Sequence, residues 1–60
     1  MDRFEARDVW DAETFLSTRR VDHFAVFEME GASFSASVWL KSPDVARLRD
    51  WLTQWLEENQ

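Results

Sequence analysis

The chain of 60 residues contains no cysteine, one histidine, one glycine and one proline. Without cysteine the fold has no disulfide and no thiolate metal centre, and a single imidazole leaves no second histidine for a metal site. The longest uninterrupted apolar run covers residues 24–27 and is far too short to cross a bilayer. The first residues also lack the basic-then-apolar order of a signal peptide. These absences predict a soluble, cytoplasmic protein without cofactor or metal.

The chain is nevertheless rich in the residues that build a core. Apolar residues make up 45% of it, and four Trp and five Phe are present beside a formal net charge of -5. This composition predicts one folded domain over residues 1–60 rather than a disordered acidic tail. Because a domain of this size buries little surface, we expect a marginal monomer that gains from a partner or from self-association.

The C-terminal third predicts an amphipathic helix over residues 43–58. Ser42 is the expected N-cap, Pro43 suits the first helical position, and Asp44 suits the positive end of the helix dipole. Six apolar residues fall within an arc of about 140° when placed on a helix. They are Val45, Leu48, Trp51, Leu52, Trp55 and Leu56. This face requires a sheet or another helix to cover it.

Two strands, over residues 21–29 and 32–41, precede the helix. A two-residue turn at Glu30 and Gly31, with Gly31 at positive φ, would join them as a hairpin. The expected cross-strand pairs are Met29 with Ala32, Phe27 with Phe34, Ala25 with Ala36, His23 with Val38 and Val21 with Leu40. All of them share one face, which is expected to pack on the helix through Phe27, Phe34, Val38 and Leu40 against Leu48, Leu52, Trp55 and Leu56.

The N-terminal third is expected to hold a short helix over residues 12–19. Asp11 reads as its N-cap, and Trp10 and Phe15 take the positions of a hydrophobic staple. Residues 3–9 fit either a third strand or an irregular arm. The predicted fold class is therefore α+β: a short N-terminal helix and an antiparallel β-hairpin, with or without a third N-terminal strand, packed on a long C-terminal helix.

Catalysis is not expected. His23 is the one side chain with a neutral-range titration, but it is expected to face Val38, while Asp22 points to the opposite face. Carboxylate pairs such as Glu28 with Glu30 or Glu57 with Glu58 have no accompanying glycine-rich loop or metal-ligand spacing. The basic residues are interleaved with acids, so direct nucleic-acid binding is not expected either.

The acidic residues offer one alternative function, mimicry of DNA. Five acids fall within the first thirteen residues and two more lie at the tip of the expected hairpin. The full set is Asp2, Glu5, Asp8, Asp11, Glu13, Glu28 and Glu30. A charge of -5 is modest for a mimic, because duplex DNA carries one negative charge per about 1.7 Å. Solvated acids that keep a small protein in solution explain the same residues.

Aromatic residues on otherwise polar faces favour protein binding instead. Phe24, Val26 and Trp39 share the polar face of the hairpin, and Trp51 lies at the edge of the helix beside Arg47. Exposed Trp and Arg are typical of binding hot spots. Two alternatives stay open: the N-terminal arm covers the hairpin cluster, or a homodimer buries it. On the binding interpretation, Trp39→Ala should spare the thermal midpoint and Trp55→Ala should unfold the domain.

The chain also resembles, in format, the small acidic inhibitors that phages encode, including anti-CRISPR proteins. It shares with them a cysteine-free single domain of this size, no catalytic motif and a composition typical of GC-rich genomes, with Arg outnumbering Lys six to one. The C-terminal stretch from Ser37 to Leu56 is similar to the strand-then-helix ending of many small phage and bacterial proteins: SVWLKSPDVARLRDWLTQWL. The resemblance implies a non-enzymatic inhibitor that sterically blocks a host or defence protein in the bacterial cytoplasm.

Overall fold

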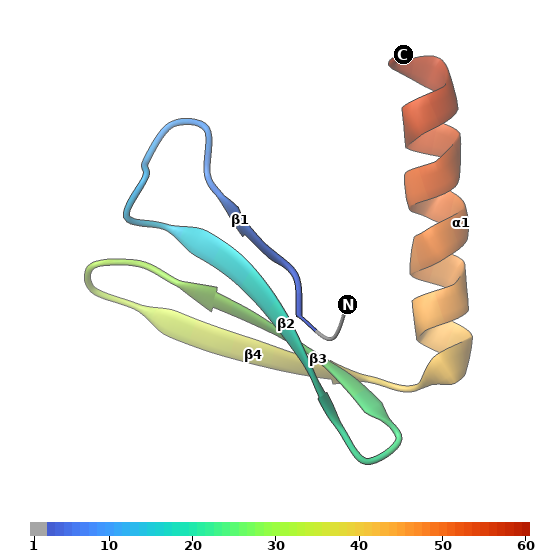
Figure 1. The fold of residues 1–60 in the computed structure, drawn as a ribbon, viewed down its shortest axis with the longest axis horizontal. Helices are drawn as coiled ribbons and strands as arrows, with labels where there is room; N and C mark the ends of the chain where they lie inside the picture. Colours follow the sequence, from blue (N-terminus) through green and yellow to red (C-terminus); the bar gives the residue numbers. More distant parts are fainter. Residues whose placement is uncertain (1–2) are drawn as a thin grey trace.

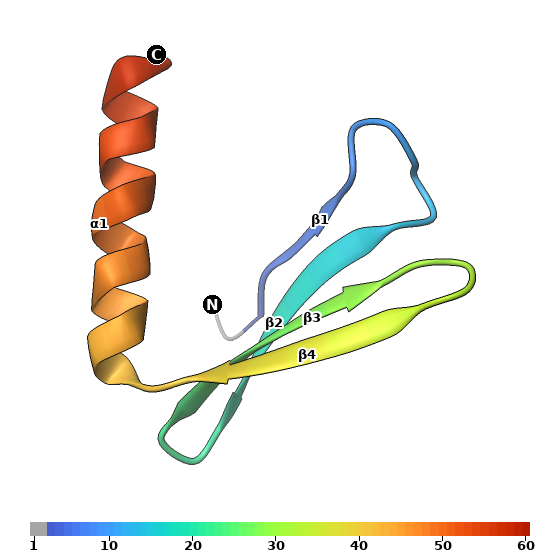
Figure 2. The same ribbon diagram turned by 180° about the vertical axis from the view of Figure 1, so that it is seen from behind.

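A computed structural model describes residues 3–60 as a four-stranded antiparallel sheet followed by one helix (Figures 1 and 2). The elements are β1 (Glu5–Arg7), β2 (Phe15–Val21), β3 (Phe24–Glu30), β4 (Ser35–Leu40) and α1 (Ser42–Glu58). The strands lie in the order β1-β2-β3-β4, so each one pairs with its neighbour in sequence. The architecture therefore combines an antiparallel meander with a C-terminal helix.

The predicted N-terminal helix is wrong, because most of its residues form β2. Asp11 does accept hydrogen bonds from the Glu13 backbone N–H (3.0 Å) and the Thr14 hydroxyl (3.0 Å), as an N-cap would. The chain then turns and extends instead of coiling, since Asx turns and N-caps begin with the same local contact. The predicted staple is absent as well: Trp10 is 92% exposed and Phe15 begins β2. The third strand that residues 3–9 allowed is present as β1.

The β3–β4 hairpin is present, but its predicted register is wrong by four residues. Phe27 pairs with Val38 rather than Phe34, and residues 31–34 form a four-residue loop. Gly31 has no positive φ. Glycine fits this position because a Cβ there would overlap the Phe34 ring. An even shift keeps the side chains of β3 and β4 on their predicted faces, so Val38 and Trp39 still point to opposite sides. Val21, predicted opposite Leu40, is the exception, because it belongs to β2 and pairs with Phe24.

The tight two-residue turn lies in the preceding hairpin instead. Val21 pairs directly with Phe24, and Asp22 has a φ of 52°, a conformation that Asp tolerates better than most residues. His23 is the second turn residue and is exposed, so the prediction that it faces Val38 from a strand is wrong. It lines a shallow depression near the start of α1, together with Arg20, Asp22 and Arg49.

The pairing defines two faces of the sheet. The groove face, which looks toward α1, carries Leu16, Thr18, Arg20, Ala25, Phe27, Met29, Ala36, Val38 and Leu40. The outer face carries Glu5, Arg7, Phe15, Ser17, Arg19, Val21, Phe24, Val26, Glu28, Glu30, Ser35, Ser37 and Trp39. Among residues 3–60, the two buried side chains, Val26 and Ser17, both lie on the outer face. The best-packed part of the molecule is therefore the side of the sheet away from the helix.

Helix α1 stands away from the sheet (Figure 1). It begins one residue earlier than predicted, with Lys41 rather than Ser42 as its N-cap and no side-chain capping bond. Val45, Ala46 and Leu48 are half-buried, whereas Leu52, Trp55 and Leu56 are 45 to 49% exposed. None of the residues of α1, all of which are described, is buried. The predicted packing of the whole apolar face on the sheet is therefore wrong beyond the first turns.

The helix does not have the character of a membrane span. Within residues 3–60, no helix combines the length and the apolar composition that crossing a bilayer requires.

Candidate protein-binding surfaces

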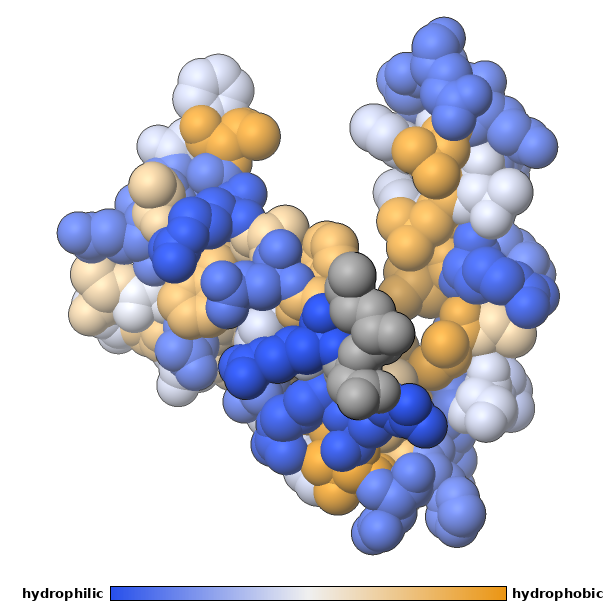
Figure 3. Space-filling model, in the orientation of Figure 1, coloured by the Kyte–Doolittle hydropathy of each residue, from blue (hydrophilic) through white to orange (hydrophobic). Residues whose placement is uncertain are grey.

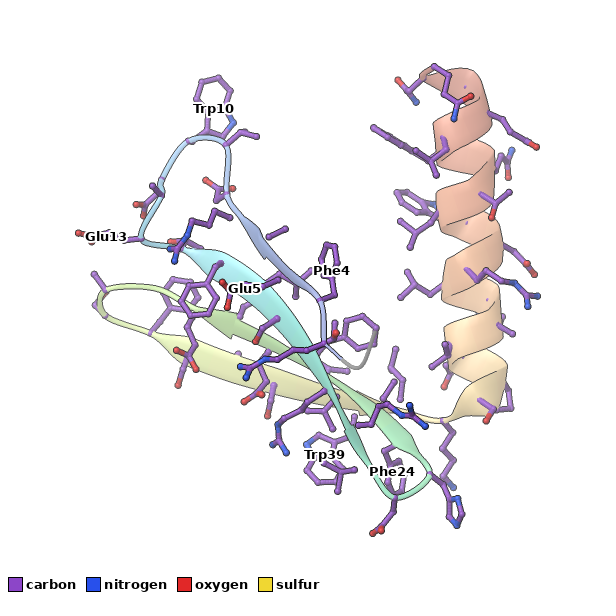
Figure 4. All side chains as sticks on the ribbon, viewed as in Figure 1. Phe4, Glu5, Trp10, Glu13, Phe24 and Trp39 are labelled. Carbon is purple, nitrogen blue, oxygen red and sulfur yellow. The ribbon has the colours of Figure 1, made fainter. Side chains whose placement is uncertain are left out.

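The loop between β1 and β2 presents the two most exposed large apolar side chains of residues 3–60. Val9 is 87% exposed and Trp10 is 92% exposed. Figure 4 shows the Trp10 ring at the tip of this loop, pointing away from the rest of the molecule. We call Val9 and Trp10 the aromatic tip. The sequence pattern predicts Trp10 in a helix staple and therefore does not indicate this exposed tip.

Hydrogen bonds hold this loop in one shape. The backbone N–H of Trp10 donates to the Asp8 carboxylate (3.0 Å), and that of Asp8 donates to the Thr14 carbonyl (2.9 Å). The Thr14 backbone N–H donates to the Asp11 carbonyl at 3.0 Å. Aspartates two positions before and one position after Trp10 could have indicated a turn built to present that residue.

Arg7 anchors the same loop from β1. Its guanidinium donates to the Ala12 carbonyl at 2.6 Å and lies 5.3 Å from the centre of the Phe15 ring. This cation–π contact joins the end of β1 to the start of β2. The aromatic tip is thus carried on a loop that is fixed at both ends, so its backbone has little conformational freedom left to lose on binding.

The predicted hairpin cluster forms, but as an internal packing unit. Val26 pairs with Arg19 on one side and Trp39 on the other, and the Arg19 guanidinium lies 6.0 Å from the Trp39 ring centre. The Phe24 and Trp39 rings meet edge to face, with centroids 5.6 Å apart (Figure 4). Val26 is consequently 0% exposed, while Trp39 keeps half its surface in solvent. We call Arg19, Phe24, Val26, Glu28 and Trp39 the outer cluster.

The two charged residues of the outer cluster, Arg19 and Glu28, form an ion pair that positions the Arg19 side chain. Arg19 Nε donates to Glu28 Oε1 at 2.8 Å, and the two side chains are 46% and 27% exposed. The pair directs the Arg19 guanidinium over Trp39. Cover by the N-terminal arm, one of the predicted alternatives, is not observed, because Phe4 reaches the groove face and Trp10 lies at the loop tip. The sheet covers this cluster with its own side chains.

The other two predicted binding residues lie apart, on α1. Trp51 is 61% exposed at the edge of the helix. Arg47 forms a solvent-exposed ion pair with Asp44 at 3.2 Å. Further along the same edge, Gln54 donates to Glu58 at 3.3 Å, and both line a small pocket with Trp51 and Trp55. The structure therefore brings Phe24, Val26 and Trp39 together but leaves Trp51 and Arg47 on a different surface.

The acids of the DNA-mimic alternative do not form one negative surface. Asp2 lies outside the described residues. Asp8 and Asp11 accept hydrogen bonds that shape the β1–β2 loop, and Glu28 pairs with Arg19. Glu5 and Glu28 flank Ser17 on the outer face, where Arg7 and Arg19 are also present. Glu13 lies on the β1–β2 loop, and Glu30 lines a polar depression beside Ser35.

An open apolar groove of about 690 Å³ separates the groove face from α1. Phe4, Leu16 and Phe27 line one wall, and Leu48, Leu52 and Leu56 line the other. Figure 3 shows apolar side chains along the side of α1 that faces the sheet. The groove leaves apolar side chains of both walls open to solvent.

Groups that could hold a metal are not assembled in the described part of the chain. Among residues 3–60, no three His, Asp or Glu side chains converge as metal ligands would. Comparison with known proteins gave no relative: no family model, no curated protein and no solved structure matches this chain. Its function must accordingly be argued from its own surfaces.

Proposed function

We propose that the chain is a non-enzymatic protein-binding module that inserts the aromatic tip into an apolar pocket of its partner. The observation that supports this proposal is a Trp 92% exposed at the end of a loop fixed by hydrogen bonds. An exposed Trp contributes nothing to the stability of the monomer, whereas Trp is the residue most enriched where binding energy concentrates.

Charge around the tip indicates the kind of pocket that would receive it. Asp8, Asp11 and Glu13 surround Trp10 on the same loop, and Arg7 is the nearby base. A pocket with an apolar floor and a basic rim would complement this arrangement, because matched charges steer the encounter and exclude wrong partners. The outer cluster supports the sheet behind the loop and does not itself have to make contact.

Inhibition of a host or defence protein is the form of binding that we propose, in the cytoplasm of a bacterial host. The resemblance in format to small phage-encoded inhibitors supports it, as does a scaffold small enough to block a site by occupying it. One bound copy per target would then suffice. Titration of the target's activity with the purified chain should end at a fixed molar ratio.

DNA mimicry is the weaker candidate on this geometry. A mimic requires carboxylates spaced along one surface, whereas here Asp8 and Asp11 shape a loop and Glu28 is paired with a base. The two functions differ in salt dependence. Binding by a mimic should weaken steeply as salt is raised, while binding anchored by Trp10 should weaken little.

Replacing Trp10 with alanine should remove binding and leave the fold intact. We expect the loss of a buried Trp anchor to weaken the complex by about thirtyfold or more. The free energy of unfolding should change by less than about 0.5 kcal/mol, because the side chain is exposed. Capture of proteins from bacterial lysate by the tagged chain, at low and high salt, measures the first effect, and thermal unfolding measures the second.

The matched control is Ser33→Ala, in the β3–β4 loop at the same end of the sheet. It should capture the same partner as the unmodified chain. Equal capture by Trp10→Ala and the unmodified chain would overturn the proposal. Loss of capture at high salt by every variant would favour the mimic.

A further inference from the structure

The folded monomer exposes more surface than a compact protein of its mass should. Its accessible surface is 5372 Å², whereas a compact protein of 7.2 kDa is expected to expose about 4,100 Å². Its radius of gyration is 12.9 Å, against about 10 Å expected for 60 residues. The excess area, about 1,200 Å², exceeds the roughly 800 Å² that each partner buries in a stable protein interface. A partner of ordinary interface size could therefore account for the open shape.

Part of this exposed surface lies at the groove. Leu52 and Leu56 in its helix wall are 45% and 49% exposed, and Phe4 in the opposite wall is 50% exposed. The groove has an apolar helix as one wall and an apolar sheet face as the other. An object that fills it must itself be elongated and apolar along its side, which describes α1.

We propose that the groove is closed by a second copy of this chain, whose α1 lies antiparallel against α1 of the first copy. The arrangement is two-fold symmetric, with Leu52 of both copies near the axis and Leu48 of each copy near Leu56 of the other. Each helix buries its apolar side in the groove of its partner. Both aromatic tips and both outer clusters lie outside this interface, so this inference goes beyond the proposed function and does not depend on it.

The charges along one edge of α1 fit this pairing. Arg47, Trp51, Gln54 and Glu58 are spaced four, three and four residues apart and therefore share one edge of the helix. In an antiparallel two-fold pair, the same edges of the two helices meet. Arg47 of each copy then faces Glu58 of the other, and Trp51 faces Gln54. Two ion pairs flank the apolar seam, one on each side of the axis.

The monomer leaves the end of this helix electrostatically unsupported. The last turn of α1 contains Glu57 and Glu58 and no base, so negative side chains lie at the negative end of the helix dipole. An antiparallel partner places its own positive helix end and its Arg47 beside them. Within one copy, Arg47 pairs with Asp44 at an exposed site, where the side-chain exposures are 84% and 55%. Such a pair is weak enough to exchange for an intermolecular one.

Charge exchange between two variants of the full chain tests the proposal. Arg47→Glu gives a helix edge with two acids, and Glu58→Lys gives one with two bases. Each variant alone should form a dimer about tenfold weaker than the unmodified chain, because two attractions per dimer become repulsions. An equimolar mixture should recover the affinity of the unmodified chain, as a heterodimer. Sedimentation equilibrium measures all three.

Glu57→Lys is the matched control, since it makes the same charge change at the neighbouring position but on the far side of the helix. It should leave the dimer affinity within about twofold. The proposal is overturned if the unmodified chain is a monomer at all concentrations tested. It is equally overturned if the mixture binds no better than the single variants, or if Glu57→Lys and Glu58→Lys have equal effects.

Discussion

Replacing Leu52 with glutamate should convert the dimer into a monomer that retains its sheet. Leu52 lies in the helix wall of the groove and is 45% exposed in the single chain. Two copies of the new carboxylate would approach each other at the two-fold axis in an apolar seam, where unpaired charges are costly. We expect a loss of about 3 kcal/mol, or more than a hundredfold in affinity. Size-exclusion chromatography with light scattering measures the mass directly.

The same charge placed away from the helix provides the control. Ser33→Glu adds one acid in the exposed β3–β4 loop and should leave the dimer unchanged. Glutamate has a high helix propensity, so α1 itself should survive the Leu52 substitution. A dimeric Leu52→Glu variant would show that the groove is closed in some other way. Far-UV circular dichroism checks that both variants keep their secondary structure.

Replacing Trp39 with alanine should destabilise the domain strongly. Trp39 pairs with Val26 across the outer face, and its ring packs against Phe24 and under the Arg19 guanidinium. Its loss opens Val26 to water and breaks both ring contacts. For a half-exposed Trp we expect about 2 kcal/mol, roughly half the cost of truncating a fully buried one. In a domain of this size the thermal midpoint should fall by about 10 °C.

This result differs from the one that the sequence suggested for Trp39. The sequence placed Trp39 on a polar face and so predicted that Trp39→Ala would spare the fold. Trp10→Ala is the comparison that separates the two roles, because it removes the same side chain from a site without packing contacts. Equal thermal midpoints for the two variants would contradict the assignment of Trp39 to a structural cluster.

Periodicity predicted the elements whose contacts are local. The 43–58 helix is found at Ser42–Glu58, since its apolar spacing and its Pro43 depend only on residues within the helix. The two faces of the β3–β4 hairpin are also as predicted. Alternation fixes the faces of two paired strands, but turn length fixes their register. A four-residue loop in place of a two-residue turn therefore moved Phe27 opposite Val38 without moving either to the other face.

The predicted N-terminal helix is wrong because the residues that indicated it span a short segment and also occur at turns. Asp11 forms the same side-chain to backbone contact in a turn as at a helix start. Residues 15–21 alternate in the structure between groove face and outer face, and they include the β-favouring Phe15, Thr18 and Val21. Pairing with β1 and β3 on both sides then outweighs any helical preference of so short a segment.

The surfaces were the least predictable part. Sequence predicted that Phe24, Val26 and Trp39 lie together, which they do, but not that Arg19 and Glu28 from paired strands complete their cover. It also expected the helix to close on the sheet, since an amphipathic face normally packs within its own chain. How far a helix stands from a sheet depends on the short connection at Lys41 and on the contacts of its first turns. The spacing of apolar residues in the sequence predicts neither the connection nor these contacts.

The central claim is that the open groove of one chain is filled by another, and thermal unfolding at different concentrations tests it most directly. A dimer that unfolds to monomers becomes more stable as concentration rises, whereas a folded monomer does not. With about 0.7 kcal/mol of unfolding enthalpy per residue in each of two chains, a hundredfold increase should raise the thermal midpoint by about 10 °C. Leu52→Glu should abolish that dependence. A midpoint that stays constant for the unmodified chain over the same range would contradict the claim.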